Sequence, residues 1–319
     1  MVYNPRPARS RGATTTGLCG MVSRSVSMHV GTCLTRVVLP ALAPIVLALM
    51  SVGAFAGEID TEHLFAFAVG TDIGEVGDKE LEGGTLARFA KRTGSYGASS
   101  STLEAEFTPL EDFRLSFGPA LARYDIAGVA GLDDRHQWAF EGASLEMRYR
   151  LLRREGSSFG LAINAEPHWE RVDEISGAPV DRTGVALLLA IDKELAANTI
   201  AVANLLYDPE VIRSRATGAW SREAVLGIAA GVMVQIHPSG FFVGGEARYL
   251  RRYEALSFEA FAGHALFVGP SMFATLSERC WISAGWGFQL AGHAVGELGP
   301  LDLTNFERQQ AIFKFGVNF

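Results

Sequence analysis

The chain has 319 residues, 48% of them hydrophobic, and its 28 basic and 35 acidic residues give a net charge of −7 at pH 7. This acidic balance argues against a nucleic-acid partner, which requires a basic face. Two of the three cysteines, Cys19 and Cys33, fall in the first 56 residues. The remaining Cys280 has no partner for an internal disulfide, and chemistry that needs a cysteine cluster is excluded.

The first 56 residues have the composition of an export signal. They contain five arginines and no acidic residue, and their apolar run from residue 37 ends in Ala54-Phe55-Ala56. A basic start, an apolar middle and a small-residue cleavage site are typical of a signal peptide, so we expect 1–56 to be a cleaved leader. The alternative is a membrane anchor, because a run of about twenty apolar residues is long enough to span. Met21 or Met28 would give a signal of more ordinary length.

Residues 57–78 are the least regular part of the chain beyond the leader. The stretch 62–74 begins Glu-His-Leu-Phe-Ala-Phe-Ala-Val-Gly. Three interpretations stay open: a further strand, a pillar inside a barrel lumen, or a periplasmic segment. We treat 57–78 as a separate N-terminal segment, periplasmic or lumenal.

From residue 79 onward, apolar and polar residues alternate in segments of roughly ten or more residues, as expected for strands with two different faces. No apolar stretch of 18 residues follows Ala56, which argues against helical membrane spans. Short connectors, such as 109–112 and 237–240, alternate with long polar ones at 91–99, 125–136, 172–182, 208–222, 252–263 and 294–308. The predicted strands are 79–91, 99–108, 113–124, 138–152, 158–170, 183–193, 198–207, 223–236, 240–251, 263–276, 281–292 and 309–319.

The last predicted strand is the most informative. Phe313, Phe315, Val317 and Phe319 share one face, while the other register is mostly polar or small. In this strand, and in the signal-like leader and alternating connectors, the chain resembles bacterial outer-membrane β-barrel proteins, in particular uncharacterised proteobacterial barrels of the porin or transporter type. Such barrels have short periplasmic turns and longer outer loops.

The resemblance implies an all-β fold over 79–319, a single antiparallel up-and-down transmembrane β-barrel, and a location in the cell outer membrane. Twelve strands are the expected number, with 10 or 14 as alternatives. It further implies contact with outer-membrane lipid and recognition of the last strand, with Phe319 as assembly signal, by the barrel-assembly machinery. A soluble all-β sandwich or barrel is the competing fold, but it would show polar outer faces.

The alternation separates a lipid face from a lumen face, because a charged side chain near the middle of the lipid face costs about 2–4 kcal/mol for Arg or Lys. Lys79, Lys91, Glu141 and Arg251 fall on the predicted lipid face, near strand ends. Strands 183–193, 198–207 and 223–236 are apolar on both faces, so their orientation is less certain. The side chains predicted to line the lumen are Glu80, Glu82, Arg88, Glu104, Glu106, Arg114, Glu146, Arg148, Arg150, Glu166, His168, Glu170, Asp192, Glu246, Arg248 and Lys314.

The densest cluster of these residues is Glu166, His168 and Glu170, which share one face. They could bind a divalent metal or act as acid and base, but a structural role for His168, bridging neighbouring charges, is the preferred interpretation. We find no serine in a recognisable outer-membrane lipase motif. The prediction is therefore a protein without catalytic residues, metal or cofactor.

Aromatic residues gather near the ends of the predicted segments, among them Trp138, Trp169, Trp220, Tyr253 and Trp281. Rings at these levels are typical of the girdles at the two membrane interfaces. A carbohydrate-stacking surface in the loops is the alternative, with Trp220 as its best candidate.

Both signs of charge occur on neighbouring predicted strands, so the lumen is expected to be narrow and ion-paired. The functional hypothesis is passive passage of small solutes through a mixed-charge lumen. A non-conducting structural or surface-interaction barrel is the second hypothesis, favoured if the 62–74 segment fills the lumen. A lipid-modifying barrel enzyme is the third.

Overall fold

The computed structural model describes residues 59–319. The predicted leader therefore lies outside the described residues. Among residues 59–319, no helix is long and apolar enough to cross a membrane.

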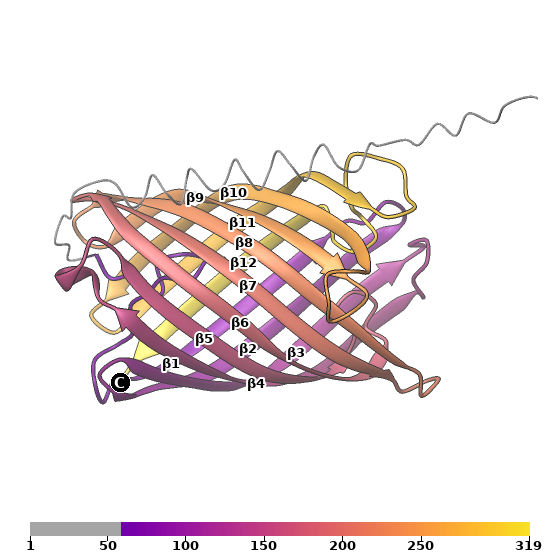
Figure 1. Cartoon of the computed structure of the whole chain (residues 1–319), viewed down its shortest axis with the longest axis horizontal. Coiled ribbons are helices and arrows are strands. Elements are labelled where there is room, and N and C mark those ends of the chain that lie inside the picture. Colours follow the sequence, from indigo (N-terminus) through magenta and orange to yellow (C-terminus); the bar gives the residue numbers. More distant parts are fainter. Residues whose placement is uncertain (1–58) are drawn as a thin grey trace, which may run out of the picture. The chain divides into compact units, whose positions relative to one another are not determined.

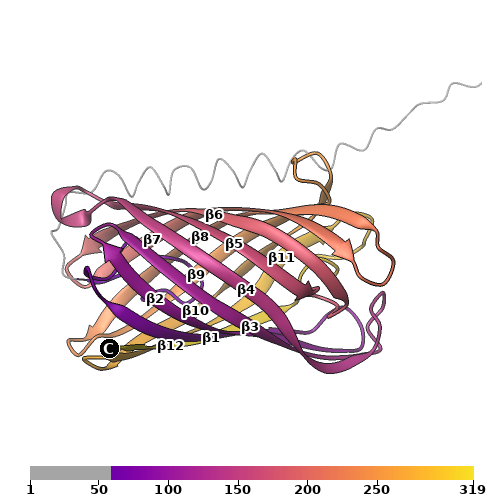
Figure 2. The ribbon, with the colours of Figure 1, turned by 90° about the horizontal axis from the view of Figure 1, so that it is seen from below.

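Twelve antiparallel strands close into a barrel, and each strand is tilted against the barrel axis (Figures 1 and 2). The predicted fold class and strand number are thus confirmed. The strands are β1 (Lys79–Phe89), β2 (Ser95–Leu110), β3 (Phe113–Ala127), β4 (Arg135–Leu152), β5 (Gly160–Val172), β6 (Pro179–Ala196), β7 (Thr199–Ser214), β8 (Trp220–His237), β9 (Phe241–Tyr253), β10 (Phe261–Ser277), β11 (Cys280–Ala294) and β12 (Gln309–Asn318); a 3-10 turn, Arg154–Gly156, follows β4.

The barrel closes where β1 pairs with β12, from Glu80 opposite Asn318 to Phe89 opposite Gln309. Every other pair joins strands that are consecutive in the sequence. Closure leaves no unpaired sheet edge, which is the condition for a sheet to cross a bilayer.

The outer face carries a belt of apolar side chains, as lipid contact requires. Leu187, Leu205 and Ile163, for example, are 44%, 47% and 43% exposed in the isolated chain. Trp138 and Trp220 also point outward, near the long-loop ends of β4 and β8. The girdle prediction is wrong for Trp281 and Tyr253, because both side chains are buried.

Several strands extend beyond their predicted ends into the expected long loops. β7 runs on to Ser214, although 208–222 was predicted as a loop, and β6 begins at Pro179 rather than at residue 183. Beyond the apolar belt the outer face is polar as well, so the alternation that identifies a strand from its sequence disappears there.

The predicted orientation of Glu141 is wrong because of a β-bulge. Ala120 of β3 lies opposite Gly142, and the next residue, Leu121, lies opposite Phe140, so Glu141 is the extra residue. A bulge turns the side chains on one side of it to the other face of the sheet. Glu141 is therefore buried inside the barrel, where Ser100 Oγ donates a hydrogen bond to it.

Lys91 is the second outward prediction that the structure contradicts. The preceding Ala90 has a left-handed backbone (φ 63°), which ends β1 and reverses the direction of the next side chain. Lys91 Nζ points inward and donates to the carbonyl oxygens of Thr304 (3.2 Å) and Phe306 (2.7 Å) in the last long loop.

Candidate functional site: the lumen

Residues 59–78 contain no strand. Residues 59–74 lie inside the barrel, in contact with inward-facing side chains of the wall, and the exposed residues 75–78 lead to β1. We call residues 59–78 the lumenal segment. At its middle, the carboxylate of Glu246 on β9 accepts backbone N–H bonds from Ala66 (2.9 Å), Phe67 (3.0 Å) and Ala68 (2.6 Å). A carboxylate that accepts several amide bonds is a strong anchor for a segment without secondary structure of its own.

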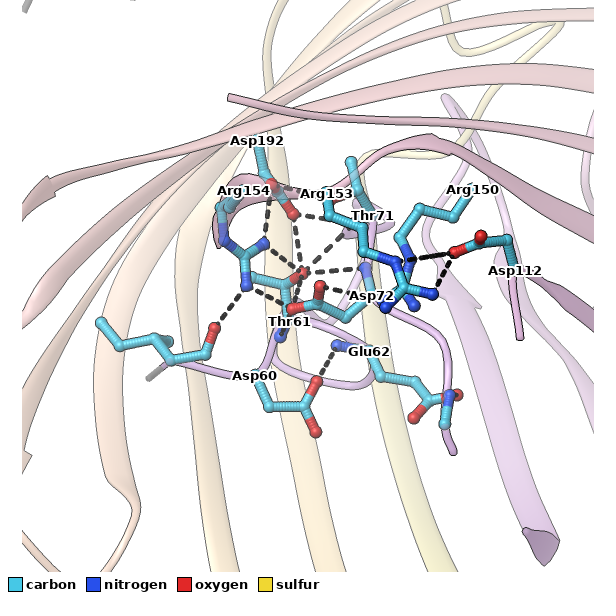
Figure 3. A network of polar contacts seen from close by, with 12 residues as sticks. Asp60, Thr61, Glu62, Thr71, Asp72, Asp112, Arg150, Arg153, Arg154 and Asp192 are labelled. Carbon is cyan, nitrogen blue, oxygen red and sulfur yellow. Dashed lines mark hydrogen bonds and ion pairs between the residues drawn. The ribbon is translucent and has the colours of Figure 1, made fainter. Parts of the chain in front are cut away.

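A second anchor lies near the short-turn end of the barrel, around Asp192 of β6 (Figure 3). Asp192 accepts hydrogen bonds from the hydroxyls of Thr61 (2.7 Å) and Thr71 (2.8 Å) and from the backbone N–H of Thr71 (2.8 Å). Arg154, in the turn after β4, pairs with Asp192 (2.7 Å) and with Asp72. The buried carboxylate thus has a cation and three other donors, which is how a buried charge is tolerated.

The lumenal segment also packs an apolar side against the inner wall. Leu64 and Phe65 are buried against Ile200 and Val202 of β7 and Met233 of β8. This contact explains why the sequences of β7 and β8 are apolar on both faces: one face contacts lipid and the other contacts the segment.

Wall glycines allow the segment to lie directly on the barrel backbone. A Cβ at Gly285 would lie 2.7 Å from Ala66 Cβ and 2.8 Å from the Phe67 ring, and one at Gly160 would overlap Thr71 Oγ1. Any larger residue at these two positions would push the segment away from the wall.

His63 connects the segment to β1. Its Nε2 lies 3.3 Å from Glu80 and its Nδ1 lies 3.4 Å from Glu82, and its ring stacks on Trp281 at a centroid distance of 4.2 Å. Burial alone would lower the pKa of His63, but the adjacent carboxylates of Glu80 and Glu82 outweigh it and raise the pKa to about 10. His63 is therefore an imidazolium at neutral pH.

Arg114 of β3 is the centre of the ionic network beside the segment. It is 4% exposed and lies 2.8 Å from Glu62 of the segment, 2.6 Å from Glu106 and 3.0 Å from Glu146. Arg148 of β4 shares Glu146 with it, at 3.1 Å. The expected network of mixed charges is present, and it includes residues of the segment.

The long-loop end of the lumen is narrowed by the loop between β5 and β6. Glu174 of this loop lies 3.2 Å from Arg88 on β1 and 3.1 Å from Arg252 on β9. Its neighbour Asp173 pairs with Arg182 of β6 at 2.8 Å. The loop between β5 and β6 thus forms ion pairs with three separate strands, β1, β6 and β9, at the long-loop end of the lumen.

The structure places all the side chains predicted to line the lumen on the inner side of the wall. Those beside the lumenal segment or its cavities are Glu80, Glu82, Glu104, Glu106, Arg114, Glu146, Arg148, Arg150, Glu166, Asp192, Glu246, Arg248 and Lys314, and those nearer the long loops are Arg88, His168 and Glu170. Glu82 lies 3.3 Å from Lys314 across the barrel closure, whereas Glu80 instead accepts a hydrogen bond from Trp281.

Glu166, His168 and Glu170 share a face but have different partners. His168 Nε2 lies 3.2 Å from Glu210 on β7, and Glu170 pairs with Arg182 at 3.1 Å. The three residues do not converge on one point, so the proposed metal or acid–base cluster is absent from the described residues in that form.

Sequence reasoning missed the inward residues Arg182, Glu210 and Arg252, which it assigned to loops. Each continues the inward register of its own strand, as in the run Glu246, Arg248, Leu250, Arg252 on β9. Extending each predicted strand by one to three residues would have found them. Nothing in the sequence identifies Glu62, His63 and Asp72 of the lumenal segment as partners of the wall.

Three groups of His and carboxylate side chains bring possible metal ligands close together: Glu62, His63 and Glu106; His63, Glu80 and Glu82; and His168, Asp208 and Glu210. Each group contains a carboxylate that already pairs with a basic residue, namely Arg114, Lys314 or Arg182. A metal ion would have to replace these ion pairs.

Three cavities follow one another along the lumen: the first two lie mainly against β1 to β5 and β12, and the third lies mainly against β6 to β9. The first, of about 330 Å³, lies near the short-turn end and shares Glu62, Glu106 and Arg114 with the second, of about 350 Å³. The second shares Leu86 and Arg88 with the third, of about 270 Å³, below the long loops. Ion-paired side chains, Arg114 and Arg88 among them, thus line neighbouring cavities jointly.

Comparison with known proteins places this architecture among bacterial outer-membrane barrels. The model of a family of unknown function, DUF6662, matches residues 57–319. No curated protein matches the chain. The COG4313 outer membrane channel from Pseudomonas putida F1 is a similar solved structure, with a TM-score of 0.54 and 13% identity over 82% of this chain and 100% of that one.

Two further solved structures are more distant. The NanC porin has a TM-score of 0.44 and 11% identity over 76% of this chain and 98% of its own. The translocator domain of the autotransporter NalP from Neisseria meningitidis has a TM-score of 0.46 and 10% identity over 78% and 91%. The closed barrel with its apolar belt is an outer-membrane β-barrel.

Proposed function

From the premise that the chain belongs to the DUF6662 family, whose function is unknown, we propose that this barrel is a narrow channel for passive passage of small polar solutes. The observation that carries the proposal is the series of three cavities beside the lumenal segment. They extend from the short-turn end to the long loops, and neighbouring cavities share lining residues. Passage would then require side chains to change rotamer, which is a smaller change than unfolding the lumenal segment.

The charges along this route define the solutes that it suits. The middle cavity is lined by Glu82, Glu104 and Glu166 as well as Arg88 and Arg148. A lumen with both signs of charge has no strong preference for anions or cations. We therefore expect a low conductance and weak ion selectivity, with exclusion by size as the main filter.

Single-channel recording on refolded protein in planar bilayers tests the proposal. Wild type should give small current steps. Glu246→Ala removes the acceptor of three backbone hydrogen bonds of the lumenal segment, and it should give larger and noisier steps. A variant that lacks residues 59–76 should conduct most. Glu297→Ala, in an exposed loop, is the control and should behave as wild type.

The alternative is a non-conducting barrel that acts through its surface. The dense anchoring of the lumenal segment by Glu246 and Asp192 favours it. A wild type that stays silent at all voltages, while the deletion variant conducts, would support this alternative and overturn the channel. The proposed passage requires no catalysis.

A further inference from the structure

The middle cavity contains an arginine with unused hydrogen-bond donors. The side chain of Arg148 is 5% exposed, and its Nη2 lies 3.1 Å from Glu146 Oε1. Its Nε and Nη1 are buried and have no hydrogen-bond acceptor among the described residues. Leaving such donors without an acceptor is costly, by about 1–3 kcal/mol for a buried group.

Glu146 cannot satisfy these donors as well. The same carboxylate already accepts hydrogen bonds from Arg114 (3.0 Å) and from Asn164 (2.9 Å). Arg148 therefore keeps unsatisfied N–H groups beside a cavity of about 350 Å³ that its side chain lines. A carboxylate of a bound solute matches such donors in charge and geometry.

Two carboxylates of the same cavity have no basic partner within ion-pair distance among residues 59–319. Glu104 accepts a hydrogen bond from Ser116 (2.7 Å), and the Ser144 hydroxyl lies beside Glu166. Neither hydroxyl supplies a positive charge. An ammonium group of a bound solute would supply it.

The strand register places Arg148 and Glu166 at a spacing that allows both to contact one small solute. Arg148 of β4 lies opposite Asn164 of β5, and Glu166 is two residues further along the same face of β5. The two backbone positions are thus about 7 Å apart along the strand and about 5 Å across it. Side chains of this length can approach one small solute from two sides.

We propose that the middle cavity binds a small zwitterionic solute of the α-amino-acid class. Arg148 binds its carboxylate, and Glu166, assisted by Glu104, binds its ammonium group. A simple anion would meet Glu104, Glu146 and Glu166, and a simple cation would meet Arg148 and Lys314. This inference rests on the proposed function, because the cavity lies on the proposed route.

The test compares three probes that share the parts of one molecule: glycine, acetate and methylammonium, each labelled with 13C. Their affinities for the refolded barrel in detergent micelles are measured by NMR line broadening. Glycine should bind about tenfold more tightly than either of the others, because it alone makes both charged contacts. Equal affinities, or no binding of glycine, would overturn the inference.

Variants locate the site. Arg148→Gln and Glu166→Gln should each weaken glycine binding about tenfold, to the level of the single-charge probes. Arg123→Gln is the control, since Arg123 lies on the exposed outer face of β3, and the affinity of this variant for glycine should be unchanged. Glu166→Gln breaks no ion pair, so it keeps the test decisive if Arg148→Gln does not fold.

Conductance of the same wild-type preparation separates the two proposals. A barrel that conducts but does not prefer glycine refutes the zwitterion site alone. A silent barrel that binds glycine through Arg148 and Glu166 refutes the channel and leaves the binding site in place.

Discussion

Individual carboxylate and arginine side chains of the wall hold the lumenal segment in the lumen. Glu246 accepts three backbone amides of the lumenal segment, and Arg114 contacts carboxylates from the segment, β2 and β4. Removing one member of a buried ion pair leaves an uncompensated charge and typically costs about 3–5 kcal/mol. These residues therefore hold the segment in place together with its buried apolar side chains.

His63 makes the free energy of unfolding of the barrel depend on pH, and the direction of its pKa shift fixes the sign of that dependence. Its pKa in the folded barrel is raised to about 10, above an unfolded value of about 6.5. The stabilisation is complete below pH about 6.5, declines as the pH rises, and is lost above about 10. His63→Gln should destabilise the barrel at pH 6 by an amount on the order of a few kcal/mol.

Urea unfolding followed by tryptophan fluorescence at pH 6, 8 and 10 measures this effect. The difference in unfolding free energy between wild type and His63→Gln should shrink steadily over this range. A difference that stays constant from pH 6 to pH 10 would show that the imidazolium does not stabilise the segment.

At the scale of the elements, the lumenal segment determines which residues the neighbouring strands carry on their inner faces. β7 and β8 must be apolar inside as well as outside, because Leu64 and Phe65 pack on Ile200, Val202 and Met233. Alternation alone cannot orient such strands, and this is why their sequences were ambiguous. The outer faces of β7 and β8 still differ from their inner faces, because they contact lipid. A charged substitution on the outer face tests this assignment.

Leu205 lies on the outer face of β7 in the apolar belt. Leu205→Arg should lower the free energy of unfolding in lipid vesicles by about 2–4 kcal/mol, because it puts a charge into the hydrocarbon. Leu110→Arg, at the short-turn end of β2, is the control and should cost about 0–1 kcal/mol. Similar costs at the two positions would contradict the assigned outer belt.

At the scale of the whole molecule, the barrel depends on the pairing of its first and last strands. Phe319 N donates to Lys79 O (3.0 Å), and β12 pairs with β1 along nearly all its length. Phe319 and its neighbours Phe315 and Val317 are exposed on the outer side. We propose that this last strand is recognised by the barrel-assembly machinery, as the resemblance to outer-membrane barrels implies.

Phe319→Ala should therefore lower the fraction of folded barrel in cells several-fold while leaving refolding in detergent unchanged. The assay is the heat-modifiable migration of the folded barrel in gel electrophoresis, applied to outer membranes and to refolded protein. Leu276→Ala, another exposed apolar residue at the short-turn end, is the control. Equal losses in both settings would indicate a stability effect instead of recognition.

The sequence by itself determined the antiparallel barrel and the inward direction of residues such as Glu146, Arg148 and Glu166, and it favoured twelve strands over 10 or 14. It could do so because a strand repeats every two residues and lipid excludes charge from one face, so the pattern is local. Only the tertiary structure decided what fills the lumen. The bulge at Glu141, the reversal after Ala90, and the contacts of His63 and Glu62 join residues far apart in the chain. Their positions follow from closing the sheet into a barrel and inserting a segment, which no local pattern records.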